Sequence, residues 1–157
     1  MTSSIIAGIT VVALQISSPS FKDNDFIPSK FTCEGESISP ELQVKNIPAN
    51  TKTLAIIVDD PDAPNGPFVH WVAFNMPASE TIPEKTVAGV MGNNGRGAKG
   101  YTGPCPPTGI HHYHFAVYAL DASLGLQEGA SKEDLKAAMD GHILGTGEIV
   151  GLYKKIK

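Results

Sequence analysis

Acidic, histidine and tyrosine side chains occur at the ends of apolar segments, where they could form one binding site. Asp60 and Asp62 directly follow an apolar run, and an unpaired carboxylate is costly to bury there. His70 begins a second apolar segment, and His111 and Tyr113 begin a third. A carboxylate that accepts a hydrogen bond from one histidine nitrogen fixes the tautomer and supports the cationic ring. The other ring nitrogen can then donate outward, so the cluster is suited to holding an oxyanion such as phosphate or a carboxylate.

A loop dense in glycine and proline directly precedes His111. Seven of the chain's 16 glycines and three of its 12 prolines lie between Gly89 and Gly109. Glycine allows positive φ and close backbone approach, and proline fixes φ. We expect this loop to present backbone N–H groups to the anion as a nest, with the Tyr113 hydroxyl as a further donor. The pattern places no strongly basic residue to grip the anion, which predicts modest affinity.

Short β-strands are expected to position these residues. Because side chains alternate along a strand, the segment 111–120 places His111, Tyr113 and Phe115 on one face and His112 and His114 on the other. The same rule for the segment 70–76 places His70, Val72 and Phe74 on one face and Trp71 and Ala73 on the other.

The remaining pattern predicts a mainly β protein with one domain spanning residues 1–157. Further strands are expected at 42–44, at the continuous apolar run 54–58 and at 148–154. Apolar residues 4–14 also fit a strand. One helix is expected after Ser131, a plausible N-cap with Asp134 three residues on, and apolar side chains follow at helical spacing.

Composition excludes several functional classes. The net charge of −4 and the absence of a basic run argue against nucleic acid as a partner. The apolar segment 4–14 is too short to span a membrane, and no basic residue precedes Lys22, as a secretory signal would require. We therefore expect a cytoplasmic protein, or a periplasmic or secreted one if segment 4–14 is a signal remnant. Cys33 and Cys105 are expected to be buried free thiols. The alternative is a disulfide, which would imply an oxidising compartment.

Other motifs favour other chemistries only weakly. Residues 95–100 match G-x-G-x-x-G, but the proline-rich sequence after them cannot begin the helix that a dinucleotide site requires. A P-loop and a G-x-S-x-G nucleophile elbow are absent from the sequence. Metal binding is the stronger rival, because His112 and His114 share a strand face. Asp60 or His70 would have to complete that site from the opposite face, so we expect no metal and no other cofactor.

Four motifs, taken together, resemble the phosphatidylethanolamine-binding protein family, also called the Raf kinase inhibitor protein family, in its prokaryotic branch. They are Phe31-Thr32-Cys33-Glu34-Gly35 with Ile38-Ser39-Pro40, Asp60-Pro61-Asp62-Ala63-Pro64, His70 to Pro77, and Asn94-x-x-Gly97-x-x-Gly100-Tyr101-x-Gly103-Pro104-Cys105-Pro106-Pro107-x-Gly109-x-His111. The resemblance covers the chain from Ser18 to Tyr153.

The resemblance implies a large antiparallel sheet packed on a smaller one, with one or two peripheral helices. It also implies a pocket for phosphate-type anions and phospholipid headgroups, formed by Asp60, Asp62, His70, Pro106, His111 and Tyr113, with Trp71, Tyr101 and Cys105 nearby. Relatives act mainly by binding, as regulators of kinases or inhibitors of proteases, and prokaryotic relatives often form dimers. This chain has His112 where relatives often carry Arg, and it ends soon after Tyr153, without the C-terminal helix of eukaryotic members. Raf-type inhibition is therefore not expected to carry over.

Three functional hypotheses follow. The first is a non-enzymatic protein that binds a small anion or a phospho-headgroup. The second is a protein that inhibits a protease or a kinase through a surface such as the loop 62–68, with a vestigial pocket. The third is a hydrolase or lyase that uses Asp60, His70 and His111.

Overall fold

The computed structural model describes residues 3–6 and 9–157, and the described chain is mainly β. Its strands are β1 (Ser3–Ile6), β2 (Ile9–Ala13), β3 (Gln15–Ser17), β4 (Asp25–Phe26), β5 (Leu42–Lys45), β6 (Thr53–Asp60), β7 (Phe68–Pro77), β8 (Thr81–Ile82), β9 (Val90–Met91), β10 (His111–Leu120) and β11 (Ile143–Tyr153). The helices are the 3₁₀-helix η1 (Ser29–Phe31) and the α-helix α1 (Lys132–Met139). The predicted N-terminal strand over 4–14 is divided between β1, β2 and Leu14, and residues 7 and 8 lie outside the described residues.

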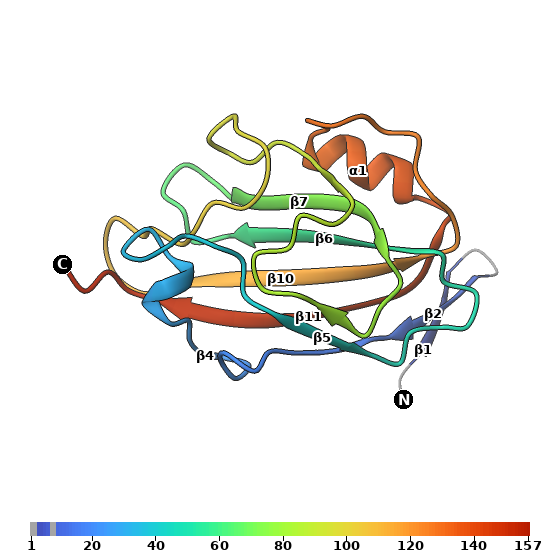
Figure 1. Cartoon of the computed structure of the whole chain (residues 1–157), viewed down its shortest axis with the longest axis horizontal. Helices are drawn as coiled ribbons and strands as arrows, with labels where there is room; N and C mark the ends of the chain where they lie inside the picture. The colour runs from blue at the N-terminus through green and yellow to red at the C-terminus, as the bar shows by residue number, and fades with distance from the viewer. Residues whose placement is uncertain (1–2, 7–8) are drawn as a thin grey trace.

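Two sheets form the architecture (Figure 1). The large sheet has the order β1-β2-β11-β10-β6-β7-β9, with β4 paired to β11, and the small sheet has the order β3-β5-β8. The central pairings β11-β10, β10-β6 and β6-β7 are antiparallel. The large sheet is nevertheless mixed, because β2 and β4 pair with β11 in parallel. The predicted packing of a large sheet on a smaller one is thus confirmed, and two short parallel pairings are added.

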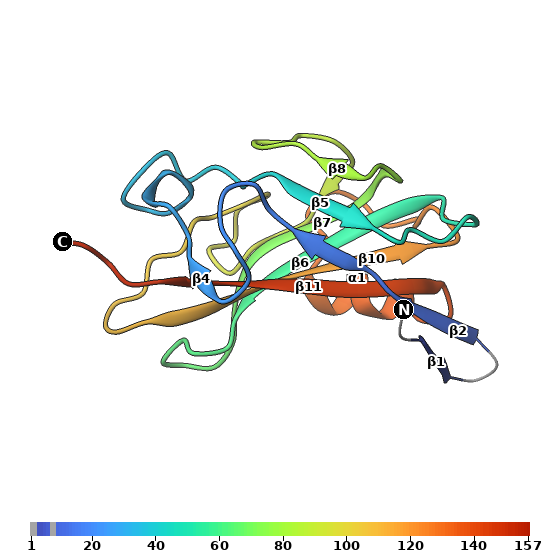
Figure 2. The ribbon, with the colours of Figure 1, turned by 90° about the horizontal axis from the view of Figure 1, so that it is seen from below.

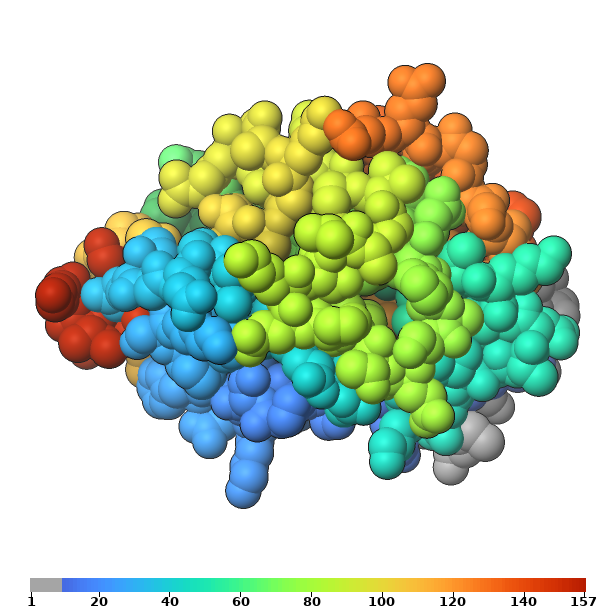
Figure 3. All heavy atoms as spheres, viewed as in Figure 1, coloured from blue at the N-terminus to red at the C-terminus, as the bar shows by residue number. Residues whose placement is uncertain are grey.

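The large sheet is covered on both faces (Figure 2). Between the two sheets lies an apolar core that includes Trp71, Tyr113 and Phe115. A second core, which includes Phe74, Leu135 and Met139, joins the opposite face of the large sheet to α1. In the space-filling view of Figure 3, connecting segments coloured blue to cyan and lime to yellow cover the face of the large sheet that faces the viewer. The central strands therefore form a buried and rigid base for these connections.

The predicted helix is confirmed, with its N-terminal cap. The Ser131 side chain accepts from the backbone N–H of Asp134, and the Asp134 carboxylate accepts from the N–H of Ser131. This reciprocal pair satisfies two N–H groups that the first helical turn leaves unpaired. No helix in the described ranges 3–6 and 9–157 is long and apolar enough to cross a membrane.

The closing strand is longer than the sequence pattern predicts. It begins at Ile143 rather than Glu148, and Gly145 and Gly147 lie inside it. A Cβ atom at Gly147 would lie 2.3 Å from the carbonyl oxygen of Leu14, which connects β2 of the large sheet to β3 of the small sheet. Glycine is therefore required in β11 where this connection passes over it. Gly147 lies inside the strand because it allows a close approach of two backbones.

Candidate functional site

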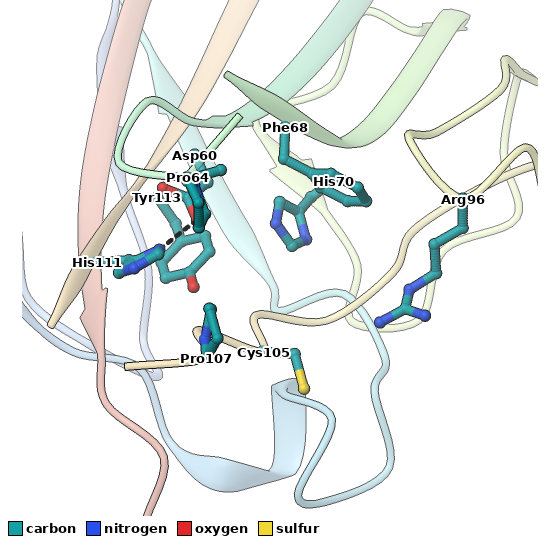
Figure 4. Close-up of a pocket in the computed structure, with 10 residues that line it drawn as sticks. Asp60, Pro64, Phe68, His70, Arg96, Cys105, Pro107, His111 and Tyr113 are labelled. Atoms are coloured by element: carbon teal, nitrogen blue, oxygen red, sulfur yellow. Dashed lines mark hydrogen bonds and ion pairs between the residues drawn. The ribbon is translucent and has the colours of Figure 1, made fainter. Parts of the chain in front are cut away.

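A cavity of about 160 Å³ lies at the end of β6 and the beginning of β10 (Figure 4). Its walls come from these two strands, from β7 and from the connections 61–67 and 92–110. The lining residues are Asp60, Ala63, Pro64, Phe68, His70, Arg96, Cys105, Pro107, His111 and Tyr113. The structure therefore brings together five of the predicted site residues: Asp60, His70, Cys105, His111 and Tyr113.

Strand register explains why Asp60 meets His111. The antiparallel pairing places His114 opposite Asp59, so Asp60 lies next to Tyr113 on the neighbouring strand. Side-chain alternation then turns Asp60, His111 and Tyr113 to the same face of the sheet, as predicted for β10. The preceding residue, Asp59, points to the opposite face, where it forms an ion pair with Lys132 at 2.7 Å.

Asp60 and His111 form a buried pair. The Nδ1 atom of His111 lies 2.7 Å from Oδ2 of Asp60, and the two side chains are only 8% and 5% exposed. The other oxygen of Asp60 accepts from the backbone N–H of Asp62 at 2.8 Å. Because the Asp60 carboxylate can only accept a hydrogen bond, Nδ1 of His111 carries the proton and donates it. Nε2 of His111 is left to contact a ligand. The pairing removes most of the cost of burying the carboxylate.

A β-bulge corrects the predicted orientation of His70. The register between β6 and β7 shifts where Val58 pairs with Trp71 but Asp59 pairs with Val69. His70 is the extra residue of this bulge, so it lies on the same side of the sheet as Trp71 rather than opposite to it. Its ring contacts the Tyr113 ring edge-on at 5.2 Å between centroids.

The protonation of His70 is set by its surroundings. Nδ1 lies 2.7 Å from the carbonyl oxygen of Thr102, which can only accept, so Nδ1 carries the proton. Burial lowers the pKa of His70 below its ordinary value, although the Thr102 carbonyl and the Asp60 carboxylate oppose this shift. At neutral pH the ring therefore presents Nε2 as an acceptor rather than a cation.

Tyr113 carries an unsatisfied polar atom at this site. Its side chain is fully buried, and among the described residues the hydrogen of its hydroxyl has no acceptor, while the Cys105 backbone N–H faces the hydroxyl oxygen. Burial, followed by the charges of Asp60 and Asp62, raises the pKa of Tyr113 above its usual range, so the hydroxyl keeps its proton. Figure 4 shows this hydroxyl pointing towards Pro107 and Cys105 across the cavity. A buried hydroxyl that lacks a partner is rare in proteins and calls for a ligand or water.

The cysteine prediction was wrong. Cys33 and Cys105 are joined in a disulfide, with 5.5 Å between their Cα atoms and a sequence separation of 72. The bond ties the loop that lines the cavity to the turn after η1. Three hydrogen bonds add to this tie: from Cys33 N–H to the Pro104 carbonyl, from the Tyr101 hydroxyl to the Phe31 carbonyl, and from Gly103 N–H to the Ser37 hydroxyl.

The first part of the glycine-rich loop, as far as Gly103, does not supply the predicted nest of free N–H groups. Its backbone donors bond within the protein instead. The N–H groups of Asn94, Gly95, Gly97, Gly100 and Thr102 donate to protein carbonyls, and that of Gly103 donates to the Ser37 hydroxyl. Of the predicted nest, the Cys105 backbone N–H beside the Tyr113 hydroxyl remains as a donor at the cavity.

Four predicted site residues lie beside the cavity rather than in its lining. Asp62 pairs with His112 on the surface at 2.7 Å, and this hydrogen bond lowers the pKa of Asp62. Trp71 donates to the Met91 sulfur, and its ring contacts Tyr101 edge-on. Pro106 is buried behind Pro107 in the loop. Trp71, Tyr101 and Pro106 therefore support the wall of the cavity.

The sequence analysis missed Arg96, Phe68, Ala63, Pro64 and Pro107. Arg96 matters most, because the expectation of no basic residue at the site is corrected by its presence in the lining. Its position within an accidental G-x-G-x-x-G match concealed it. The length of the loop before β10, which begins at the site, was the signal that could have identified Arg96.

His112 and His114 occupy the outer face of β10, as predicted. His112 bonds Asp62, and His114 bonds Glu148 of the adjacent strand at 2.9 Å. Within residues 3–6 and 9–157, no three histidine, cysteine or acidic side chains are grouped as metal ligands would be. These histidines therefore pair with carboxylates on the surface.

Comparisons with known proteins agree with this geometry. The family model described as phosphatidylethanolamine-binding protein matches residues 17–154. The chain belongs to this family. A UPF0098 protein of Pyrococcus horikoshii is 49% identical, with 92% of this chain and 78% of that protein covered. A UPF0098 protein of Methanothermobacter thermautotrophicus is 46% identical, with 90% and 99% covered.

Solved structures of family members have the same fold. A putative phosphatidylethanolamine-binding protein homolog from Chlamydia trachomatis superposes with a TM-score of 0.87 at 41% identity, over 91% of this chain and 98% of that one. E. coli YbcL, described as a new member of the mammalian family, gives 0.83 at 29% identity, over 92% and 99%. The predicted family and architecture are thus confirmed.

Proposed function

We propose that this member of the phosphatidylethanolamine-binding protein family binds a small phosphate-type anion, free or as a phospho-headgroup, in the cavity at Asp60 and His111. The observation that carries the proposal is the Tyr113 hydroxyl, which is buried and protonated and whose hydrogen has no acceptor among the described residues. An anionic oxygen in the cavity would satisfy this donor and remove the cost of an unpaired buried hydroxyl.

The other lining groups complement the same ligand. Nε2 of His111 is a donor when the ring is charged, and Arg96 brings a permanent positive charge to the rim. Nε2 of His70 can accept from a protonated ligand oxygen or an amine. The cavity of about 160 Å³ is smaller than the roughly 300–1,000 Å³ of pockets that enclose drug-sized ligands. A phosphate group or a headgroup fits this volume, and the acyl chains of a lipid would have to remain outside.

Binding rather than catalysis is the proposed activity. The lining contains no serine or threonine, and its only cysteine, Cys105, is held in the disulfide. A hydrolase built on Asp60, His70 and His111 would need water as its nucleophile. A kinase or protease partner and a homodimer remain predictions, with the loop 62–68 beside the cavity as the candidate contact for a protease or kinase.

Isothermal titration calorimetry with inorganic phosphate and with phosphoethanolamine tests the proposal. The informative variant is Tyr113→Phe, and Tyr118→Phe is its matched control, because Tyr118 lies on the opposite face of β10 beside α1. A hydrogen bond to a charged group contributes about 1.5–3 kcal/mol, so Tyr113→Phe should weaken binding roughly tenfold or more. It should change the free energy of unfolding little, since the hydroxyl hydrogen has no protein acceptor and only the Cys105 backbone N–H faces the hydroxyl oxygen. The absence of saturable binding to the wild type, or equal affinities for the two variants, would contradict the proposal.

A further inference from the structure

The turn that contains Arg96 is fixed by hydrogen bonds from a buried side chain. The buried Asn94 side chain accepts from the backbone N–H of Arg96 at 2.9 Å and donates to the carbonyl of Gly100 at 2.9 Å. Gly97, with φ of 74°, then takes the left-handed conformation that lets the chain reverse. The backbone of Arg96 is therefore fixed, and only its side chain is free to adjust.

Thr102 orients both the Arg96 guanidinium and the His70 ring. Nε of Arg96 donates to the Thr102 hydroxyl at 3.1 Å, while the Thr102 carbonyl accepts from His70 at 2.7 Å. The described part of the chain offers no carboxylate in an ion pair with Arg96, and its hydrogen bond occupies Nε alone. Figure 4 shows the guanidinium directed towards the Cys105 side of the cavity, with its terminal nitrogens leading. The Nε edge of the guanidinium is thus anchored, and its two terminal Nη groups are left for a ligand.

Arg96 supplies the positive charge that attracts an anion to the cavity. Asp60 is the acidic lining residue, and its carboxylate pairs with His111. His70 presents a neutral ring, so Arg96 supplies the positive charge that His111 and Asp60 together do not. A planar guanidinium binds two oxygens of one phosphate in parallel, which a point charge does less specifically.

We propose that Arg96 is a specificity-determining residue, and that it makes the cavity select phosphomonoesters over phosphodiesters. This inference rests on the proposed function. A phosphomonoester carries a charge of about −1.5 to −2 at pH 7 and three unesterified oxygens. With three unesterified oxygens it can engage more of the donors that line the cavity, namely the Arg96 guanidinium, Nε2 of His111 and the Tyr113 hydroxyl. A phosphodiester has one charge and two unesterified oxygens, and its second ester arm must also leave a cavity of about 160 Å³.

Calorimetric titrations with phosphoethanolamine and with glycerophosphoethanolamine test the selection. The first represents a soluble phosphomonoester, and the second is the diester headgroup of a phospholipid without its chains. The variants are Arg96→Gln and Arg96→Lys. The control is Lys99→Gln, three residues along the same loop, where the exposed lysine pairs with Glu128 outside the cavity.

The wild type should bind the monoester at least tenfold more tightly than the diester. Arg96→Gln should weaken monoester binding roughly tenfold and diester binding less than threefold, so that selectivity falls. Arg96→Lys should restore part of the lost affinity, because it keeps the charge but not the fork. Lys99→Gln should behave as the wild type does.

Equal losses for both ligands in Arg96→Gln, or no loss for either, would overturn the assignment to Arg96 while the proposed function stands. A wild type that prefers the diester would overturn the selection. If the wild type binds neither phosphoethanolamine, glycerophosphoethanolamine nor phosphate, the proposed function itself fails, and this inference fails with it.

Discussion

Removal of the Cys33–Cys105 disulfide tests how the wall of the cavity is stabilised. The bond closes a loop across a sequence separation of 72 residues. The chain-entropy relation gives about 3 kcal/mol for a 15-residue loop and about 4.7 kcal/mol for a 100-residue loop, so a loop of this length corresponds to roughly 4 kcal/mol at 25 °C. The double variant Cys33→Ala/Cys105→Ala should lose up to this amount of unfolding free energy, because its unfolded chain is no longer constrained.

Urea unfolding of the oxidised wild type and of the double variant measures this loss. The m-value should also rise in the double variant, since the unfolded chain without the cross-link exposes more surface. Reducing agent added to the wild type should reproduce both changes and leave the variant unaffected. A wild type whose unfolding midpoint and m-value do not respond to full reduction would refute the entropic reasoning. The hydrogen bonds of Tyr101 and Gly103 to residues 31 and 37 should keep the native wall in place.

Three further predictions concern stability. Because burial lowers the pKa of His70, the unfolded chain binds its proton more readily, and the stability present above pH ~6.5 should fall as the pH drops below that value. Urea unfolding at pH 7.5 and 5.5 should show a smaller pH effect in His70→Gln, and an unchanged effect would contradict the assignment. Ser131→Ala should cost about 1 kcal/mol by loss of the helix cap, and an unchanged unfolding midpoint would show that the cap contributes nothing. Gly151→Ala places a Cβ atom 2.4 Å from Cγ1 of Ile27 and should lower the free energy of unfolding by about 1–3 kcal/mol. A thermal unfolding midpoint that does not fall would contradict this prediction.

Side-chain periodicity was enough to predict the central strands and the helix. Alternation along β10 correctly separated His111 and Tyr113 from His112 and His114, because that strand is regular opposite β6. The cap at Ser131 was equally local and therefore readable. The family motifs supplied the packing of the two sheets, which depends on contacts between distant segments and has no local pattern.

Errors arose where tertiary contacts override local pattern. The bulge that turns His70 towards the cavity depends on pairing with β6, so alternation along β7 alone could not show it. The disulfide depends on two turns 72 residues apart, which spacing cannot place together. Arg96 reaches the cavity through a loop conformation fixed by the Asn94 side chain. The site therefore depends on loops, whereas sequence patterns report mainly on strands and helices.

The most direct test of the central claim is a titration of the histidine ring signals by NMR with inorganic phosphate. The five histidines of the chain divide into two that line the cavity, His70 and His111, and three that do not, namely His112, His114 and His142. Binding in the cavity predicts saturable shifts in the first two, with one dissociation constant, and little change in the other three. Shifts that are absent, or that are spread evenly over all five rings without saturation, would contradict an anion site between Asp60, His111 and Tyr113.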